Sequence, residues 1–225
     1  MIQLSAAIMH APWARNRVPY VLNIKRELQR AHIPVTVVED KKREGCWPTS
    51  RRARLAIAAG ATHQLVVQDD MILCARFADL MADAVAANPA AIISFYCPYK
   101  KLMQAKGVSS WGVMVGKAYT TALVMPVELA REFVAYGDRV VTDSKSDDWR
   151  LCLFAESRGL KVWTTAPSLA QHAMPLESLM GHSSAVLIRQ APWFDPAPRR
   201  IDWTKGLTAP LVVVKTKVPQ PLGTQ

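Results

Sequence analysis

Short apolar segments alternate with longer amphipathic ones through the first half of the chain. Apolar runs bounded by polar, Gly or Pro residues are typical of buried strands, and they occupy residues 2–9, 35–38, 65–67 and 91–96. The segments between them have helical patterning, and they occupy residues 18–31, 51–59 and 77–87. For the second of these helices, Thr49 or Ser50 is a suitable N-cap and Gly60 a suitable stop.

The second half of the chain is less regular. Strands are expected at 111–115, 122–125 and 162–164, and helices at 127–136 and 147–158. Beyond residue 167 the chain is irregular and rich in proline. Helices alternating with buried strands predict an α/β fold, with a mostly parallel twisted sheet and helices on both faces. We expect one domain over residues 1–204 and a proline-containing tail over 205–225.

Length and composition agree with one globular domain. The chain has 225 residues, half of them hydrophobic, which excludes an intrinsically disordered protein. No uncharged apolar stretch has the length of a membrane span. The apolar amino terminus has no preceding basic residues, which favours a first strand over a signal peptide and a cytoplasmic location. Cys46, Cys74, Cys97 and Cys152 lack the spacing of a zinc site, so reduced thiols are expected.

The net charge of +10 predicts a polyanionic partner, such as a nucleotide, a nucleic acid or an anionic envelope polymer. Solvated surface is the alternative explanation for any single basic cluster. The clusters are Arg26 with Arg30, Lys41 to Arg43, Arg51 with Arg52 and Arg54, Lys100 with Lys101, and Arg199 with Arg200.

Two adjacent carboxylates, Asp69 and Asp70, directly follow an apolar strand. The carboxyl end of such a strand is where open α/β sheets place ligands. Two acids there repel one another, so a cationic group is expected beside them. Mg²⁺ or Mn²⁺ meets this need, since hard cations prefer carboxylate oxygens and carry phosphates. The alternative is a strand-end loop whose acids face water or cap the next helix.

A second acidic pair, Asp147 and Asp148, opens a helix, where the dipole favours anions. One interpretation is an N-cap followed by an acidic first turn. The other makes one carboxylate a general base that deprotonates an acceptor hydroxyl. Because neighbouring helical residues point in different directions, we assign Asp147 as the cap and Asp148 as the base.

Several short motifs follow one another along the chain. In order they are His10 and Arg15, Glu39-Asp40, Ser50 to Arg54, Val67 to Asp70, Ser146 to Leu151, Gly159 to Val162, and Pro167 to His172 followed by His182. Their order resembles that of the small bacterial and phage glycosyltransferases of the GT-A fold that end in a Pro-Ser-Leu-x-x-His segment. The resemblance covers about residues 2 to 185.

The resemblance implies a nucleotide-sugar donor and a divalent metal that neutralises the departing diphosphate. It implies that Asp70 is a metal ligand and that Asp69 reaches the ribose or supports the site. His172 is the first choice for the late histidine ligand and His182 the second. Gln68 stands where the family's Asp-x-Asp motif has its first acid, so fewer charges would face the metal.

The same resemblance places nucleoside contacts at the end of the second strand. Glu39 and Asp40 match that position, although a solvated strand end is an equal alternative. Arg51 or Arg52 would hold the diphosphate, since guanidinium groups suit phosphate, and Arg15 is a further candidate.

Two other residue types complete the interpretation. His10 is interpreted as a hydrogen-bonded loop histidine without a catalytic role. Trp111, next to Gly112 and after a basic loop, is expected to stack on a sugar or a base.

The leading hypothesis is a metal-assisted glycosyltransferase acting on a hydroxyl acceptor in the cytoplasm of a bacterium or a phage-infected cell. The acceptor is either DNA with a modified base, which would explain the basic clusters, or an anionic envelope glycan. Two other classes stay open. One is a two-metal nuclease or nucleotidyltransferase using Asp69, Asp70, Asp147 and Asp148. The other is a non-catalytic, basic nucleic-acid-binding module.

Overall fold

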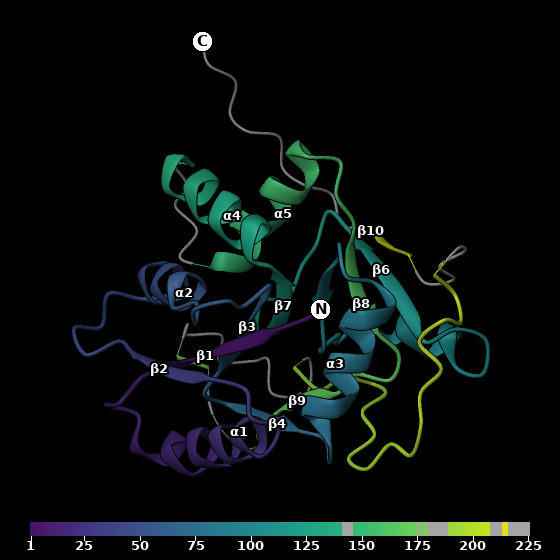
Figure 1. The fold of residues 1–225 in the computed structure, drawn as a ribbon, viewed down its shortest axis with the longest axis horizontal. Coiled ribbons are helices and arrows are strands. Elements are labelled where there is room, and N and C mark those ends of the chain that lie inside the picture. The colour runs from purple at the N-terminus through teal and green to yellow at the C-terminus, as the bar shows by residue number, and fades with distance from the viewer. Residues whose placement is uncertain (141–145, 175, 177, 180–188, 208–212, 216–225) are drawn as a thin grey trace.

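The computed structural model describes residues 1–140, 146–174, 176, 178–179, 189–207 and 213–215. An eight-stranded sheet in the order β10-β6-β8-β5-β7-β3-β1-β2 lies at its centre, beside a small sheet of β4 and β9 (Figure 1). The strands are β1 (Leu4–His10), β2 (Val35–Glu39), β3 (His63–Gln68), β4 (Met71–Leu73), β5 (Ile92–Ser94), β6 (Trp111–Val115), β7 (Ala122–Pro126), β8 (Val162–Thr165), β9 (Ala170–His172) and β10 (Val213–Lys215). The helices are η1 (Arg15–Arg17), α1 (Val18–Arg30), α2 (Cys46–Leu55), α3 (Phe77–Ala87), η2 (Lys100–Ala105), α4 (Val127–Arg139) and α5 (Asp147–Ser157).

The predicted α/β fold is confirmed. Parallel pairing joins β1 to β2, β1 to β3, β5 to β8 and β10 to β6. Antiparallel pairing joins β3 to β7, β5 to β7 and β6 to β8. β7 is antiparallel to both of its neighbours, and β2, β1 and β3 form a parallel unit at one end of the sheet.

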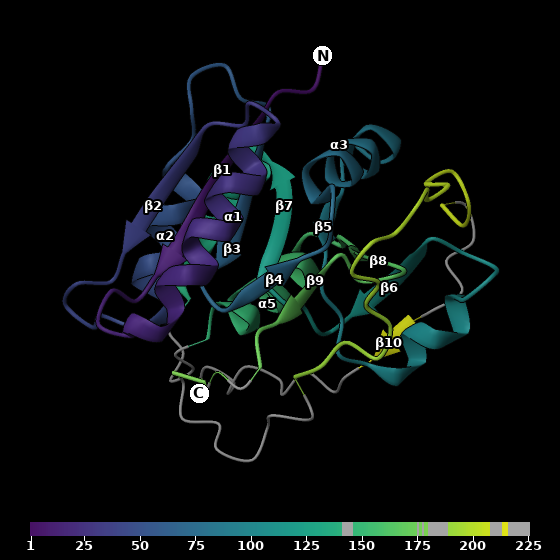
Figure 2. The same ribbon diagram turned by 90° about the horizontal axis from the view of Figure 1, so that it is seen from below.

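Strand β1 separates the two helical layers. Its alternate residues Ala6 and Ile8 belong to the core cluster that includes α1 and α3, whereas Ala7 and Met9 pack with Ala53 of α2. Helices α1 and α2 therefore cover opposite faces of the sheet (Figure 2). The chain leaves β1 for β2 on one side and then returns past it to β3 on the other. This reversal is a topological switch point, where open α/β sheets bind ligands outside the carboxyl ends of their strands.

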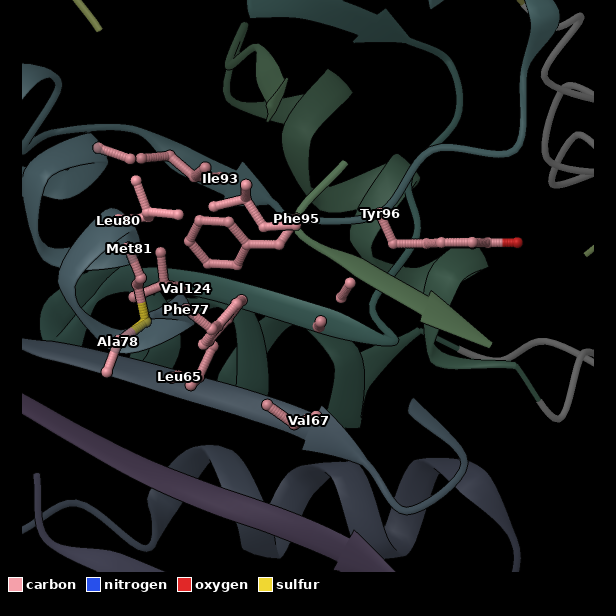
Figure 3. Close-up of a cluster of buried hydrophobic side chains, with 14 of the residues drawn as sticks. Leu65, Val67, Phe77, Ala78, Leu80, Met81, Ile93, Phe95, Tyr96 and Val124 are labelled. Atoms are coloured by element: carbon pink, nitrogen blue, oxygen red, sulfur yellow. The ribbon is translucent and has the colours of Figure 1, made fainter. Parts of the chain in front are cut away.

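The main core lies between α3 and the middle of the sheet. Phe77 of α3 meets Phe95 edge to face, with ring centroids 5.2 Å apart. Leu65 of β3 and Val124 of β7 point into the same cluster (Figure 3). Tyr96, the next residue after Phe95, extends in the opposite direction and places its hydroxyl outside this cluster.

Helix α2 begins and ends earlier than predicted. The expected range of 51–59 with a cap at Thr49 or Ser50 is wrong, because the helix begins at Cys46 after Gly45 and ends at Leu55. Gly45 has a φ of +100°, a conformation that L side chains rarely adopt. Pro48 then falls in the first turn, where a missing backbone N–H leaves no helical hydrogen bond unmade.

Three short strands were not predicted: β4, β9 and β10. β4 and β9 pair with each other although about a hundred residues separate them in the sequence. No tight turn connects them, so the sequence near each strand does not show that the two are paired. β10 lies within the predicted tail and pairs with β6. The domain boundary at residue 204 stays a prediction.

Candidate functional site

A cavity of about 350 Å³ opens at the carboxyl ends of β1, β2 and β3. The strand ends contribute His10, Asp40, Asp69 and Asp70 to its wall. Parallel register explains the convergence, since His10 pairs with the last residue of β2 and Met9 with the last residue of β3. The remaining wall comes from η1, the loop before α2, the start of α2 and the carboxyl-terminal segment, which contribute Trp13, Arg17, Arg43, Gly45, Cys46, Thr49, Ser178, Leu179 and Arg189.

Asp69 is a fully engaged carboxylate that ties three segments together. Its Oδ1 accepts a hydrogen bond from Arg17 Nη1 at 2.5 Å. Its Oδ2 accepts from the backbone N–H of Ala11 at 2.7 Å and contacts Nδ1 of His10 at 2.9 Å. Asp69 is 3% exposed, so these partners replace its lost hydration. The carboxylate fixes His10, Arg17 and the end of β3 as one unit.

Asp70 lies against His172, as the resemblance implied. The pairing of β4 with β9 sets Met71 opposite His172 and brings Nδ1 of His172 to 3.3 Å from Asp70 Oδ2. The same oxygen accepts from Arg189 Nη2 at 2.6 Å and lies 3.4 Å from Arg17 Nη2. Burial alone raises the pKa of Asp70, but the surrounding His172, Arg17 and Arg189 outweigh it and hold that pKa well below its usual range. Asp70 is therefore ionised.

The divalent metal implied by the resemblance does not fit these side chains as they are arranged. Among the described residues, no three His, Cys, Asp or Glu side chains come together as a metal site. Arg189 already bonds Asp70 Oδ2 and contacts His172 Nδ1, and both oxygens of Asp69 accept hydrogen bonds. Asp70 Oδ1 is buried and makes no hydrogen bond with a described residue, so it is a single free oxygen where a metal needs several ligands. His182 lies outside the described residues.

The second acidic pair departs from the predicted roles. Asp147 is not the N-cap of α5, because Ser146 takes that position and its Oγ accepts from the N–H of Asp148. Asp147 is buried and its carboxylate turns inward, where Ser50 donates to it at 2.6 Å and Thr120 at 2.7 Å. A side chain that bonds into the core cannot also cap the helix that it starts.

Arg54 is the buried cation beside Asp147. Its Nη2 lies 3.9 Å from Asp147 Oδ2, and neither side chain is more than 1% exposed. Arg54 Cζ lies 5.0 Å from the Phe133 ring centre, over the ring. Within the described part of the chain, its Nε, Nη1 and Nη2 make no hydrogen bond. Asp147 thus compensates a charge in the core, which is a structural role.

Asp148 shares one hydroxyl with Asp147. Its Oδ1 accepts from the backbone N–H of Thr120 at 2.7 Å and lies 2.6 Å from Thr120 Oγ1. Thr120 has a single hydroxyl hydrogen and contacts both carboxylates, so its hydroxyl donates to one of them at a time. Burial, followed by the charge of Asp147, raises the pKa of Asp148 to about 6, against a smaller lowering by Thr120.

Two connections join this second cluster to the cavity. Cys46 lines the cavity, and its Sγ donates to Asp147 Oδ1 at 3.2 Å. Burial and then Asp147 raise the pKa of the Cys46 thiol, so it stays protonated. On the other side, Tyr96 stacks edge to face on His172 at 4.9 Å and on Tyr119 at 5.6 Å. Tyr119 adjoins Thr120, which holds Asp148.

Only one of the predicted nucleoside residues lines the cavity. Asp40 does, and its carboxylate accepts from the N–H groups of Glu44 and Gly45. Glu39 instead forms an exposed ion pair with Lys41 at 3.0 Å and is absent from the cavity wall.

The predicted diphosphate arginines also lie outside the cavity wall. Arg51 pairs with Asp138 at 2.8 Å and Arg52 pairs with Glu44, while Arg15 is exposed. The early start of α2 puts Thr49, and not the arginines, at the cavity. The cavity's own cations are Arg17, Arg43 and Arg189.

The sequence did not reveal two of the cavity side chains, Arg17 and Arg189, because only their tertiary contacts place them there. Arg17 lies two residues beyond Arg15 and is 5% exposed, but nothing in its neighbours marks it as buried. Arg189 belongs to none of the motifs recognised in the sequence. His10 was interpreted as hydrogen-bonded, and its partner is Asp69. The expected role of Trp111 is wrong, because its ring is fully buried against Trp163 and Trp203.

Comparison with solved structures agrees with the GT-A-like fold. The chain is similar to a glycosyltransferase involved in the glycosylation of the major capsid of PBCV-1, with a TM-score of 0.50 and 8% identity over 78% of this chain and 95% of that chain. It also matches A197 from STIV, with a TM-score of 0.47 and 12% identity over 77% and 86% of the two chains. A third match is a Drosophila β1,4-galactosyltransferase 7 variant in complex with manganese, UDP-Gal and xylobiose, with a TM-score of 0.44 and 8% identity over 84% and 80%.

At identities of 8% to 12%, these similarities concern the fold alone and do not show which reaction the chain catalyses. No protein-family model matches the sequence, and no curated protein matches it either. None of the helices in the described ranges combines the length and apolar character needed to cross a membrane.

Proposed function

We propose that the chain transfers a glycosyl group from a nucleoside-diphosphate sugar to a hydroxyl acceptor. The observation that carries the proposal is the position of the Asp69–Asp70 pair. It ends β3 at a topological switch point and lines a cavity that also holds Arg17, Arg43 and Arg189. Guanidinium groups suit the oxygens of a diphosphate. The glycosyltransferase with the similar fold supports this reaction class.

The cavity mouth suits a nucleoside. Trp13 is 38% exposed, and its Nε1 donates to the carbonyl oxygen of Asp40 at 3.1 Å. Arg43 Cζ lies 4.7 Å from the centre of the Trp13 ring. A held aromatic ring beside a guanidinium is a platform on which a base can stack. Asp40 shapes the loop that carries Arg43 by accepting from Glu44 and Gly45.

The reaction that we propose uses Asp148 as general base. Asp148 is not one of the side chains that line the cavity, and it is connected to the wall through Thr120, Asp147 and Cys46. The acceptor hydroxyl oxygen attacks the anomeric carbon of the donor, and the hydroxyl proton passes to the Asp148 carboxylate. The bond from the anomeric carbon to the diphosphate oxygen breaks, and its electron pair leaves with the diphosphate. A raised pKa makes Asp148 a stronger base than an ordinary aspartate while it is still ionised at neutral pH.

The test of this proposal is calorimetric binding of a panel of nucleoside-diphosphate sugars. We expect one of them to bind the wild type, and Arg43→Ala to weaken binding about tenfold or more, because a charged hydrogen bond contributes about 1.5–3 kcal/mol. Arg51→Ala is the matched control, since Arg51 pairs with Asp138 outside the cavity and its loss should leave binding unchanged. Absence of binding by every donor, or equal loss in both variants, would contradict the proposal.

DNA is the acceptor that we propose, because contacts with its phosphates would account for the charge of +10, and an anionic envelope glycan is the alternative acceptor. The geometry gives no support to the nuclease alternative. Asp69 and Asp70 lie among arginines, whereas Asp147 and Asp148 lie around Thr120, and in the described ranges no three acids meet as an ion site.

A further inference from the structure

Asp70 and His172 meet at one nitrogen of Arg189. Its Nη2 lies 2.6 Å from Asp70 Oδ2 and 2.8 Å from His172 Nδ1. The guanidinium donates to the Asp70 carboxylate. His172 Nδ1 also lies 3.3 Å from Asp70 Oδ2, and its donor or acceptor role depends on the tautomer of the ring. A carboxylate oxygen and an imidazole nitrogen aimed at one point are also what a divalent metal requires.

Arg189 is held in this position by the fold. Its carbonyl oxygen accepts from the hydroxyl of Tyr96 at 2.6 Å. The flanking chain is fastened to β9, because Gln171 Oε1 accepts from the N–H of Ala191 at 2.9 Å and Gln190 Nε2 donates to the carbonyl of His172 at 3.3 Å. The Arg189 side chain is 17% exposed, so it is a wall of the cavity and not a free surface arginine.

Among the described residues, arginines balance the charges of the acid pair. Asp69 pairs with Arg17, and Asp70 pairs with Arg189 and, at longer range, with Arg17. Two carboxylates thus face two guanidinium groups. An added divalent cation would lie within contact distance of Arg189, and the two like charges would repel each other.

We infer that the guanidinium of Arg189 takes the place of a divalent metal between Asp70 and His172. On this inference the described part of the site needs no metal, because the chain itself supplies the cation. The second part of the inference rests on the proposed function: Arg189 and Arg17 neutralise the charge that develops on the departing diphosphate. Asp70 then positions Arg189 and is not a metal ligand.

The first test needs only the wild-type protein. Binding of Mn²⁺ is followed by the electron paramagnetic resonance signal of the free ion, and thermal unfolding is measured with Mn²⁺ and with EDTA. We expect neither loss of free-ion signal nor a shift in melting temperature at up to about 1 mM Mn²⁺, since a ligand that does not bind the native state cannot stabilise it. Stoichiometric Mn²⁺ binding that Asp70→Asn abolishes would overturn the inference.

The second test removes the Arg189 guanidinium. Arg189→Ala leaves Asp70 Oδ2 and His172 Nδ1 facing each other without a cation, so we expect this variant to gain Mn²⁺ binding and Mn²⁺-dependent thermal stability. Adding His172→Ala should remove the gain. Arg199→Ala, which deletes an exposed arginine, is the matched control and should behave as wild type. A folded Arg189→Ala protein that binds no more Mn²⁺ than the control would contradict the inference.

The metal experiments are independent of the proposed function, because their readouts involve no sugar donor. Suppose that the protein binds no nucleotide sugar but gains Mn²⁺ binding in the Arg189→Ala variant. The inference that Arg189 replaces a metal would then stand, and the proposed glycosyl transfer would be wrong. With a donor in hand, wild-type binding and turnover should be equal in EDTA and in Mn²⁺. Loss of more than about tenfold in EDTA, roughly the contribution of one charged hydrogen bond, would overturn the diphosphate role.

Discussion

At the scale of single residues, the site depends on side chains whose partners lie far away in the sequence. The acid pair at 69 and 70 is visible in the sequence because it interrupts an apolar run. Its charge partners, Arg17 and Arg189, are not visible, since the residues next to an arginine in the sequence do not show whether its side chain is buried or exposed. The sequence therefore predicted a cationic group beside the acid pair, and among the described residues Arg17 and Arg189 are the cations that lie there. The roles of Asp147 and Asp148 differ for a similar reason, because only folding brings Thr120 and Ser50 to them.

The shared hydroxyl of Thr120 leads to a pH prediction. Asp148 accepts a proton only when ionised, and its pKa is about 6, so activity should rise with pH through about 6 and be lost below it. The hydroxyl of Thr120 lowers the pKa of Asp148. Thr120→Val should therefore move the acid limb of the kcat profile to higher pH.

The neighbouring threonine supplies the control for this profile. Thr121 is buried, and its Oγ1 makes no hydrogen bond with any described residue. Thr121→Val should therefore leave the acid limb where it is in the wild type. An unshifted limb in Thr120→Val, or an equal shift in both variants, would contradict the role of Asp148.

At the scale of elements, long patterned segments were predictable and short paired ones were not. Helices α1, α3 and α5 begin where the pattern places them, because an amphipathic stripe is a local property. Strands β4 and β9 are three residues each and exist through their mutual pairing, which no local pattern encodes. That pairing is what delivers His172 to Asp70. The part of the site built by β1, β2 and β3 was thus predictable from local patterns. His172 of β9 was expected only from the resemblance, and Arg189 was not expected at all.

The contact between α2 and α5 gives a stability prediction. Asp147→Asn removes the carboxylate that faces the fully buried Arg54, which should destabilise the protein by about 3 kcal/mol in urea unfolding. Arg54→Met in the same chain removes the unpaired charge, so the double variant should be more stable than the Asp147→Asn single variant. Strictly additive losses would show that the two side chains do not interact.

At the scale of the whole molecule, the cavity does not account for the net charge of +10. The aspartates and arginines on its wall nearly cancel each other's charge. The excess lies in exposed groups such as Lys100 and Lys101 at the start of η2. If DNA is the acceptor, its affinity should fall with salt at a log–log slope of about −0.9 per phosphate contact. Replacing both lysines by Ala should flatten the slope by about 1.8 when both contact phosphates, without changing donor affinity.

A control variant separates contact from overall charge. Arg131→Ala with Arg158→Ala also removes two positive charges, but both arginines are paired with glutamates on the surface of α4. This pair should leave the salt slope unchanged. Equal flattening in both double variants would indicate net charge alone, and salt-independent activity on a neutral glycan would exclude DNA as the acceptor.

The most direct test of the central claim is release of nucleoside diphosphate from a nucleotide sugar, with wild type and Asp148→Asn compared at equal donor saturation. We predict that the wild type cleaves one donor of the panel. We predict that Asp148→Asn binds the same donor with unchanged affinity but cleaves it about 10²–10⁴-fold more slowly, the usual loss when a general base is removed. Equal rates in the two proteins would contradict the role of Asp148, and no release from any donor, with DNA or a glycan present, would contradict sugar transfer.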